Sequence, residues 1–169
     1  MLNALERCRV PSIAAIAGAC TGGGAAIAAC CDLRIGAANA RFGFPIARTL
    51  GNCLSMSNYA RLSALIGPAR VKEVIFTARL VDAAEAHAIG LLGEVLPDAE
   101  ALAARATELA QLIAGHAPLT LEVTKEALRR LGEGDHTDED LIVKCYTSED
   151  FREGMEAFLN KRTPVWRGV

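Results

Sequence analysis

Residues 21–26 read TGGGAA, residues 31–35 read CDLRI and residues 41–46 read RFGFPI, and these three runs decide the fold. An apolar segment over residues 12–18 leads into the three glycines, and an Ala-rich stretch of helical character follows them. Such a turn brings backbone N–H groups to a helix N-terminus without side chains in the way, where they can hold a developing negative charge. No carboxylate, His or Lys lies between Gly22 and Cys31. The turn therefore carries no acid or base of its own.

The composition indicates a globular protein with a substantial core. The 169 residues are 51% hydrophobic and 22% charged, and the net charge is −2, whereas disordered chains are less apolar. The sequence has no basic stripe and no alternation of basic with aromatic residues. Nucleic acid is therefore not expected as a partner.

The cysteines and the long uncharged segment bear on where the protein resides. The six cysteines fit no zinc spacing, and Cys30 and Cys31 are adjacent, so small, buried, reduced thiols and a cytoplasmic location are expected. Residues 10–31 carry no charge and follow two arginines, as a membrane span or signal peptide would. The central glycines would weaken a spanning helix by roughly 1 kcal/mol each relative to Ala. No membrane association is therefore expected.

The order of elements predicts an α/β core followed by helices. Strands are expected at residues 12–17, 32–35, 40–44 and 91–96. Helices are expected after the glycine turn, at 55–66 and 70–77, and through most of residues 82–162, with capping signals at 82–85, 98, 137–140 and 147–150. The predicted division is a partial α/β core at 1–97 and a helical region at 98–169. So few strands suggest part of a larger α/β fold.

Taken in order, the motifs resemble those of the enoyl-CoA hydratase/isomerase (crotonase) superfamily. The matching segments are residues 11–18, 22–24, 31–34, 41–45, 67–73, 82–97, 117–128, 148–154 and 158–162. Any one of them alone is weak, but the ordered run is specific and covers nearly the whole chain. The resemblance implies a ClpP/crotonase-like fold with a C-terminal trimerisation region. The chain resembles only the C-terminal two-thirds of family members.

The resemblance implies roles for residues near the glycine turn. Family chemistry passes through a thioester enolate held by two backbone N–H donors, and Gly23 would be the second donor, with Gly22 in the substrate pocket. The first donor would belong to the absent N-terminal part, and a missing donor costs roughly 3–4 kcal/mol of transition-state stabilisation. The family's hydratases carry two glutamates at the positions of Ala26 and Ile46. Neither residue can activate water or deliver a proton, so both would only line the pocket.

A polar loop follows these positions. Arg48 and Asn52 would either contact the substrate or complete a turn through the Asn side chain. Cys53 is expected to be a small core thiol rather than a nucleophile, because neither His nor Lys adjoins it. The three histidines, at 87, 116 and 136, lack metal-ligand spacing, so surface or capping roles and no metal are expected.

The resemblance also implies a contact to CoA near the C-terminus. Phe158 would pack near the adenine and Lys161 would meet the 3′-phosphate, often across a subunit boundary. The alternative for Lys161 is a helix-end cation favoured by the helix dipole.

The predicted function is that of an acyl-CoA-binding member of this family, which acts on a CoA thioester through an oxyanion hole and needs no other cofactor. The alternatives are a non-catalytic acyl-CoA-binding or scaffold subunit and an inactive, N-terminally truncated product. The resemblance implies a homotrimer or hexamer built through the C-terminal helices. Self-association through residues 137–161 is also expected because a short terminal appendage does not need so many apolar positions. These positions are Leu141, Ile142, Tyr146, Phe151, Met155 and Phe158.

Overall fold

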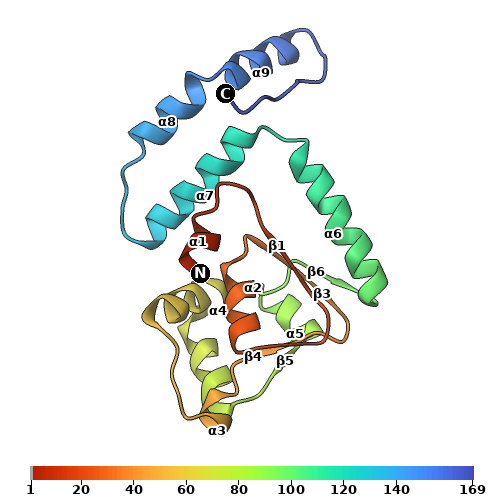
Figure 1. Ribbon diagram of the computed structural model, residues 1–169, viewed down its shortest axis with the longest axis vertical. Coiled ribbons are helices and arrows are strands. Elements are labelled where there is room, and N and C mark those ends of the chain that lie inside the picture. Colours follow the sequence, from red (N-terminus) through yellow and green to blue (C-terminus); the bar gives the residue numbers. More distant parts are fainter. Residues whose placement is uncertain (1) are drawn as a thin grey trace. The chain divides into compact units, whose positions relative to one another are not determined.

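The structure, a computed structural model, describes residues 2–169 and comprises two units (Figure 1). Unit 1 consists of residues 2–6 and 12–108, and unit 2 of residues 7–11 and 109–169. The elements of unit 1 are α1 (Leu2–Glu6), β1 (Ile13–Ile16), β2 (Ala19–Thr21), α2 (Gly23–Cys30), β3 (Leu33–Ala37), β4 (Arg41–Gly43), α3 (Ile46–Thr49), α4 (Met56–Thr77), β5 (Val81–Asp82), α5 (Ala83–Ala88), β6 (Glu94–Leu96) and the first part of α6 (Ala99–Ala114). Unit 2 holds the end of α6, α7 (Pro118–Gly132), α8 (Glu139–Tyr146) and α9 (Glu149–Leu159). The division between residues 97 and 98 stays a prediction.

Unit 1 is built on two small sheets whose strands are interleaved along the chain. Their strand orders are β1-β3-β6 and β2-β4-β5. The β1–β3, β3–β6 and β2–β4 pairs are parallel, and β5 runs antiparallel to β4. The chain therefore crosses from the first sheet to the second twice, between β1 and β2 and again between β3 and β4. At the first crossing Gly18 has a φ of 77°, a conformation that only glycine adopts without strain.

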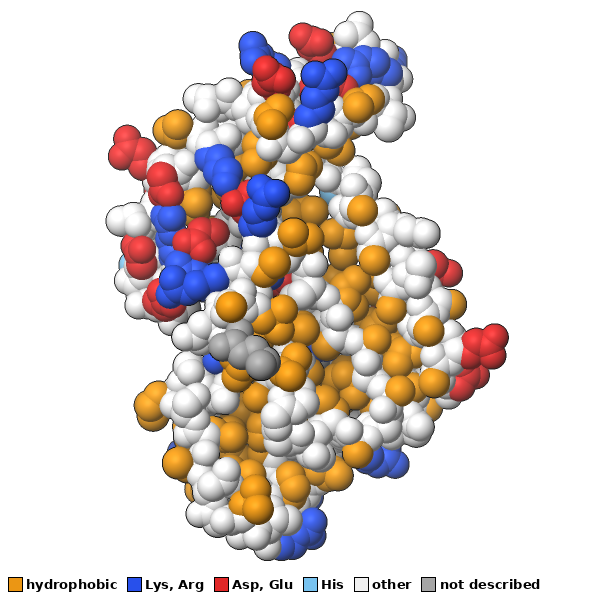
Figure 2. All heavy atoms as spheres, viewed as in Figure 1, with side chains coloured by type: hydrophobic (Ala, Val, Ile, Leu, Met, Phe, Trp, Pro, Cys, Tyr) orange, Lys and Arg blue, Asp and Glu red, His pale blue; other side chains and the backbone are white. Residues whose placement is uncertain are grey.

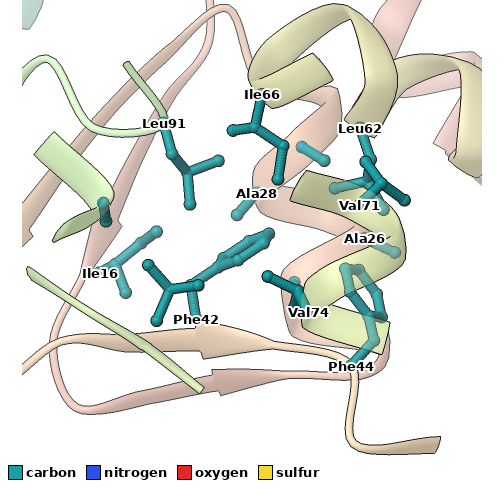
Figure 3. Packing of buried hydrophobic residues seen from close by; sticks show 14 of the residues in the cluster. Ile16, Ala26, Ala28, Phe42, Phe44, Leu62, Ile66, Val71, Val74 and Leu91 are labelled. Atoms are coloured by element: carbon teal, nitrogen blue, oxygen red, sulfur yellow. The ribbon is translucent and has the colours of Figure 1, made fainter. Parts of the chain in front are cut away.

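One hydrophobic cluster joins α2 and α4 to the strands (Figure 3). The rings of Phe42 and Phe44 pack edge to face with centroids 5.8 Å apart, and Figure 3 shows aliphatic side chains of α4 pointing toward them. Each large apolar side chain buried in this way stabilises the fold by about 1.5–3 kcal/mol. The small Ala-rich face of α2 allows the helix to lie close to these neighbours, as the Ala-rich sequence suggests.

Unit 2 is helical, and its C-terminal segment folds back onto α9. The buried carboxylate of Asp150 accepts hydrogen bonds from the backbone N–H groups of Arg167 (2.8 Å) and Gly168 (2.9 Å). Glu153 accepts another from Val165 N at 2.8 Å. The indole of Trp166 lies where a side chain at Gly154 would otherwise project. Figure 2 shows charges of both signs over the visible face of this unit.

The sequence predicted the fold class correctly, but it missed three short elements. These are β2, β5 and α3, each of four residues or fewer, which is too short for a periodic pattern. The expected stop at Gly67 is confirmed: α4 consists of two helical stretches joined across a kink, where Gly67 takes a non-helical φ of 79° and ψ of 151° and Pro68 follows.

The predicted cap of α8 and the burial of two thiols were wrong. Asp138 is the N-cap residue of α8 and makes no side-chain cap bond, while Thr137 bonds to Asp135 instead. Cys8 and Cys53 are exposed, because both lie in irregular segments that no helix or strand directs into a core. Within residues 2–169, no helix is long and apolar enough to cross a membrane.

Candidate functional site

The glycine turn opens α2 without any side-chain cap. Gly22 is the N-cap residue, with φ 54° and ψ −118°, a combination that side chains disfavour. The first intrahelical bond runs from Ala26 N to Gly22 O at 3.0 Å. The N–H groups of Gly23, Gly24 and Ala25 precede that bond and have no intrahelical acceptor. The helix N-terminus therefore offers backbone donors, with the positive end of the helix dipole behind them.

A hydrogen bond ties this turn to the segment that leads to Ile46. Gly22 N donates to Gly43 O at 3.4 Å, next to the Thr21–Gly43 register of β2 and β4. Gly43 itself has no room for a side chain, since a Cβ would lie 2.9 Å from Arg79 O. Gly43 belongs to a quoted motif, but the sequence did not single it out as the acceptor that fixes the turn.

The positions of the two family glutamates are apolar and buried. Ala26 is 7% exposed and Ile46 is 6% exposed, and both belong to the main hydrophobic cluster. Figure 3 shows Ala26 on α2 among Phe44, Val71 and Val74. The structure thus places Gly22, Gly23, Ala26 and Ile46 in one unit, linked by the β2–β4 pairing. Whether Ala26 and Ile46 line a substrate pocket stays a prediction.

The thiols around α2 do not replace the missing carboxylates. Cys20 precedes the turn in β2, and Cys30 ends α2. Burial raises the pKa of both thiols above the ordinary value, because a thiolate is poorly solvated there. Both therefore stay protonated near neutral pH and supply no base.

The loop after Ile46 is held by backbone hydrogen bonds and by one from the Thr49 hydroxyl to Pro45 O. Arg48 lies in α3 and Asn52 follows it, and both side chains are exposed. The turn is closed by Gly51, whose φ is 64° and whose N–H donates to Ile46 O at 2.8 Å. Among residues 2–169, the Asn52 side chain makes no hydrogen bond that would complete the turn. Contact of Arg48 and Asn52 with a substrate stays a prediction.

Unit 2 contains the two residues expected to meet CoA. Phe158 is 84% exposed near the end of α9 and lines a cavity of about 320 Å³ together with Phe151, Met155 and Trp166. Its ring therefore combines an apolar setting with an accessible face. Packing against an adenine stays a prediction.

Lys161 has an unusual backbone conformation. Its φ is 52°, in the left-handed region that normally favours glycine. It follows the C-cap residue Asn160, and its N–H donates to Phe158 O (3.2 Å) while Arg162 N donates to Ala157 O (3.0 Å). This pair of bonds is the Schellman motif, whose left-handed residue is usually glycine.

The neighbouring cation differs from Lys161. Arg162 pairs with Glu153, at 2.8 Å between Nη2 and Oε2, and lies near Glu156. Lys161 has no ion-pair partner in the part of the chain that the structure describes. Lys161 is therefore a cation without an ion-pair partner among the described residues, and its backbone is in a strained conformation.

The histidines and acidic residues form no metal site that the structure describes. His87, His116 and His136 are exposed, and His87 Nδ1 lies 3.0 Å from Leu92 O. Among residues 2–169, no three His, Cys, Asp or Glu side chains are grouped so that they could hold a metal ion.

Comparison with known proteins identifies the family. The enoyl-CoA hydratase/isomerase family model matches residues 1–169. The chain belongs to this family. It is 38% identical over 166 residues to the short-chain-enoyl-CoA hydratase of Clostridium acetobutylicum, with 94% of this chain and 62% of the relative covered. It is 33% identical to the mitochondrial methylglutaconyl-CoA hydratase of Rattus norvegicus, with 99% and 56% covered.

Solved structures confirm the crotonase-like fold. An enoyl-CoA hydratase/isomerase family protein from Hyphomonas neptunium superposes with a TM-score of 0.91 at 36% identity, over 99% of this chain and 65% of that chain. An enoyl-CoA hydratase/carnithine racemase from Magnetospirillum magneticum gives 0.89 at 34% identity, over 99% and 63%. The chain therefore spans less than two thirds of the length of these relatives.

Proposed function

We propose that this protein binds CoA thioesters and that ordinary hydratase chemistry is absent from it. The observation that carries the proposal is the uncapped, glycine-lined N-terminus of α2 in a member of the enoyl-CoA hydratase/isomerase family. The thioester oxygen would accept from Gly23 N–H, which needs no side chain and so survives the replacements nearby. No cofactor other than the CoA substrate is required.

The buried apolar positions define what the site lacks. Hydration needs a base that activates water and an acid that protonates the α-carbon. Ala26 and Ile46 can do neither, and the pKa values of the nearby Cys20 and Cys30 thiols are raised. We therefore favour binding, or chemistry that needs only enolate stabilisation, over water addition.

Recognition of the CoA moiety is assigned to unit 2. Lys161 is proposed to meet the 3′-phosphate and Phe158 to pack near the adenine. The support is that Lys161 occupies a left-handed position without an ion-pair partner among the described residues, where glycine would be less strained. Interaction with the helix dipole explains a cation near the end of α9. It does not explain why the cation occupies the strained left-handed position, because a cation elsewhere in the last turn would interact with the dipole equally well.

Calorimetric titration of the chain with CoA and with dephospho-CoA tests this assignment. Lys161→Ala should weaken CoA binding by about tenfold or more, since a hydrogen bond to a charged group contributes about 1.5–3 kcal/mol. Binding of dephospho-CoA should hardly change, and Lys161→Arg should retain most of the affinity. Equal losses for both ligands would reject the contact. An absence of binding by the unmutated chain would favour the truncated, inactive product.

We also propose that α8 and α9 mediate self-association into a trimer or hexamer. Ile142, Tyr146, Phe151 and Met155 are exposed apolar residues on these helices, whereas Leu141 is buried within its own unit and is removed from the expected set. An apolar surface of this extent marks interfaces. A scaffold subunit that pairs with other acyl-CoA proteins would use the same helices. A cytoplasmic location remains part of the proposal.

A further inference from the structure

Residues 33–72 carry an unbalanced positive charge. They contain five arginines and one lysine but no Asp or Glu, although the whole chain has a net charge of −2. The carboxylates that flank this stretch are already engaged. Asp32 accepts from the backbone N–H and the hydroxyl of Ser12, both at 2.7 Å, and Glu73 pairs with Arg79. The stretch therefore has no anion of its own to neutralise its cations.

One of these cations stands apart from the others. Three have partners within residues 2–169, in the pairs Arg34 with Leu91 O, Arg41 with Ala40 O and Arg61 with Glu6. Arg70 and Lys72 lie on α4, within three residues of Glu73. Arg48 is exposed, and among the described residues its guanidinium makes neither an ion pair nor a hydrogen bond.

Local structure does not explain a cation at position 48. α3 has only four residues, so it has almost no dipole for a cation in its last turn to stabilise. The loop is closed by backbone hydrogen bonds and by the Thr49 hydroxyl, which donates to Pro45 O at 2.9 Å. Removal of the Arg48 guanidinium would therefore leave every described hydrogen bond of the loop intact.

Arg48 lies at the same end of the β2–β4 pair as the glycine turn. The two strands are parallel, with Thr21 aligned with Gly43, so their carboxyl ends lie together. Gly23 begins α2 two residues after Thr21, and α3 begins three residues after Gly43. Figure 1 shows β2 leading into α2 and β4 leading toward α3 at this end of the pair. Ligands of α/β proteins bind outside such carboxyl ends.

The segment between β4 and Arg48 offers only apolar side chains, which are Phe44, Pro45, Ile46 and Ala47. The carboxyl end of the β2–β4 pair thus combines backbone N–H donors at α2, apolar residues and then a cation without a partner. This order suits an acyl group whose thioester end is neutral and whose far end is negatively charged.

We propose that Arg48 selects CoA thioesters of short dicarboxylic acids by pairing with the terminal carboxylate of the acyl group. The inference rests on the binding of CoA thioesters at Gly23 proposed above. A guanidinium can donate two parallel N–H bonds to one carboxylate. Asn52 lies exposed in the same loop, and its side-chain amide, which makes no hydrogen bond within residues 2–169, supplies a further donor.

The phosphates of CoA are the other anions that such a ligand carries. The 3′-phosphate is assigned to Lys161, in unit 2. A contact between Arg48 and any CoA phosphate would strengthen the binding of every CoA thioester alike. A contact with the acyl carboxylate strengthens the binding of dicarboxylic thioesters alone, and the two possibilities therefore differ in a measurable way.

Calorimetric titration of the full chain with glutaryl-CoA and valeryl-CoA tests the inference. The two acyl groups have the same number of carbons, and valeryl-CoA ends in a methyl group instead of a carboxylate. Glutaryl-CoA should bind about fivefold tighter or more, because only its carboxylate can accept a charge-assisted hydrogen bond. Raising the ionic strength should reduce this preference, because Arg48 is exposed and salt screens its charge.

Three variants complete the experiment, each checked for folding by circular dichroism. Arg48→Gln should bind both thioesters within about twofold of the affinity of the unmutated protein for valeryl-CoA, because the charged donor is gone. Arg48→Lys should keep part of the preference, since an ammonium provides a charge without the two parallel donors. Arg70→Gln removes the same charge from an exposed site on α4 and should keep the full preference.

Four outcomes would overturn the inference. Equal affinities of the unmutated protein for the two thioesters would do so while leaving the proposed function intact. Equal losses for both ligands in Arg48→Gln would place the guanidinium on a CoA phosphate. A loss of preference in Arg70→Gln as large as that in Arg48→Gln would show a general effect of the positive stretch. Binding of neither thioester by the folded protein would refute this inference and the proposed function together.

Discussion

Replacing Lys161 by glycine should stabilise the protein while weakening its proposed binding of CoA. A side chain in the left-handed region costs roughly 1–2 kcal/mol, and Lys161 has a φ of 52°. The conformation persists because it closes two hydrogen bonds, Lys161 N to Phe158 O and Arg162 N to Ala157 O, which together contribute about 1–3 kcal/mol.

The expected gain follows from these two magnitudes. Glycine removes the strain and keeps both bonds, but it raises the entropy of the unfolded chain by about 0.4–1 kcal/mol. The net increase in the free energy of unfolding should be about 0.5–1 kcal/mol, or a rise of roughly 1–4 °C in Tm for a chain of this size.

Urea denaturation of Lys161→Gly, Lys161→Ala and Lys161→Arg separates strain from charge. Lys161→Ala loses the charge and keeps the strain, so it should be less stable than the glycine variant. Lys161→Arg keeps both features and should match the unmutated protein. A glycine variant no more stable than the alanine variant would refute the reasoning that Lys161 is held in a costly conformation.

Three further predictions follow from burial and charge. Ala26→Glu should lower the free energy of unfolding by at least about 2 kcal/mol, measured by thermal or urea unfolding, because it buries a carboxyl in an apolar cluster. Burial raises the pKa of that new carboxyl, so the loss of stability should grow as the pH rises above about 5. The control Ile27→Glu, at a 44% exposed site on the same helix, should cost much less. The guanidinium of Arg162 lowers the pKa of Glu153 to about 2. The contribution of this pair to the free energy of unfolding should therefore be complete above about pH 5 and be lost as the pH drops toward 2. Glu153→Gln should flatten that pH dependence, and an unchanged pH profile would contradict the pairing. Sedimentation should show self-association at micromolar concentration that Tyr146→Asp, a change at an exposed site on α8, reduces without unfolding the chain; a well-folded monomer of the unmutated protein would exclude the proposed interface.

The sequence predicted those parts of the fold that carry long or specific patterns. The glycine triplet located the start of α2, and Asp82 caps α5 through its bond to Glu85 N at 2.9 Å. Ser148 likewise caps α9, by accepting from Phe151 N. These features depend on local chemistry that two or three neighbouring residues determine, which is why they can be recognised without tertiary contacts.

Other features depend on contacts between distant residues and left no local signal. β2 exists because it pairs with β4, and three residues have no periodicity of their own. The acceptor for Gly22 N is Gly43, which lies 21 residues away. The left-handed Lys161 was also unforeseen, because the usual sign of such a conformation is a glycine.

Binding of a CoA thioester without hydration is tested most directly by calorimetric titration of the purified chain with crotonyl-CoA. The ligand is then recovered from the calorimeter's sample cell and analysed. We expect measurable binding and recovery of crotonyl-CoA unchanged, because backbone N–H donors remain at α2 while Ala26 and Ile46 supply neither base nor acid. Recovery of the hydrated thioester, formed at a rate comparable to that of an intact family hydratase, would contradict it. So would an absence of binding by a folded protein.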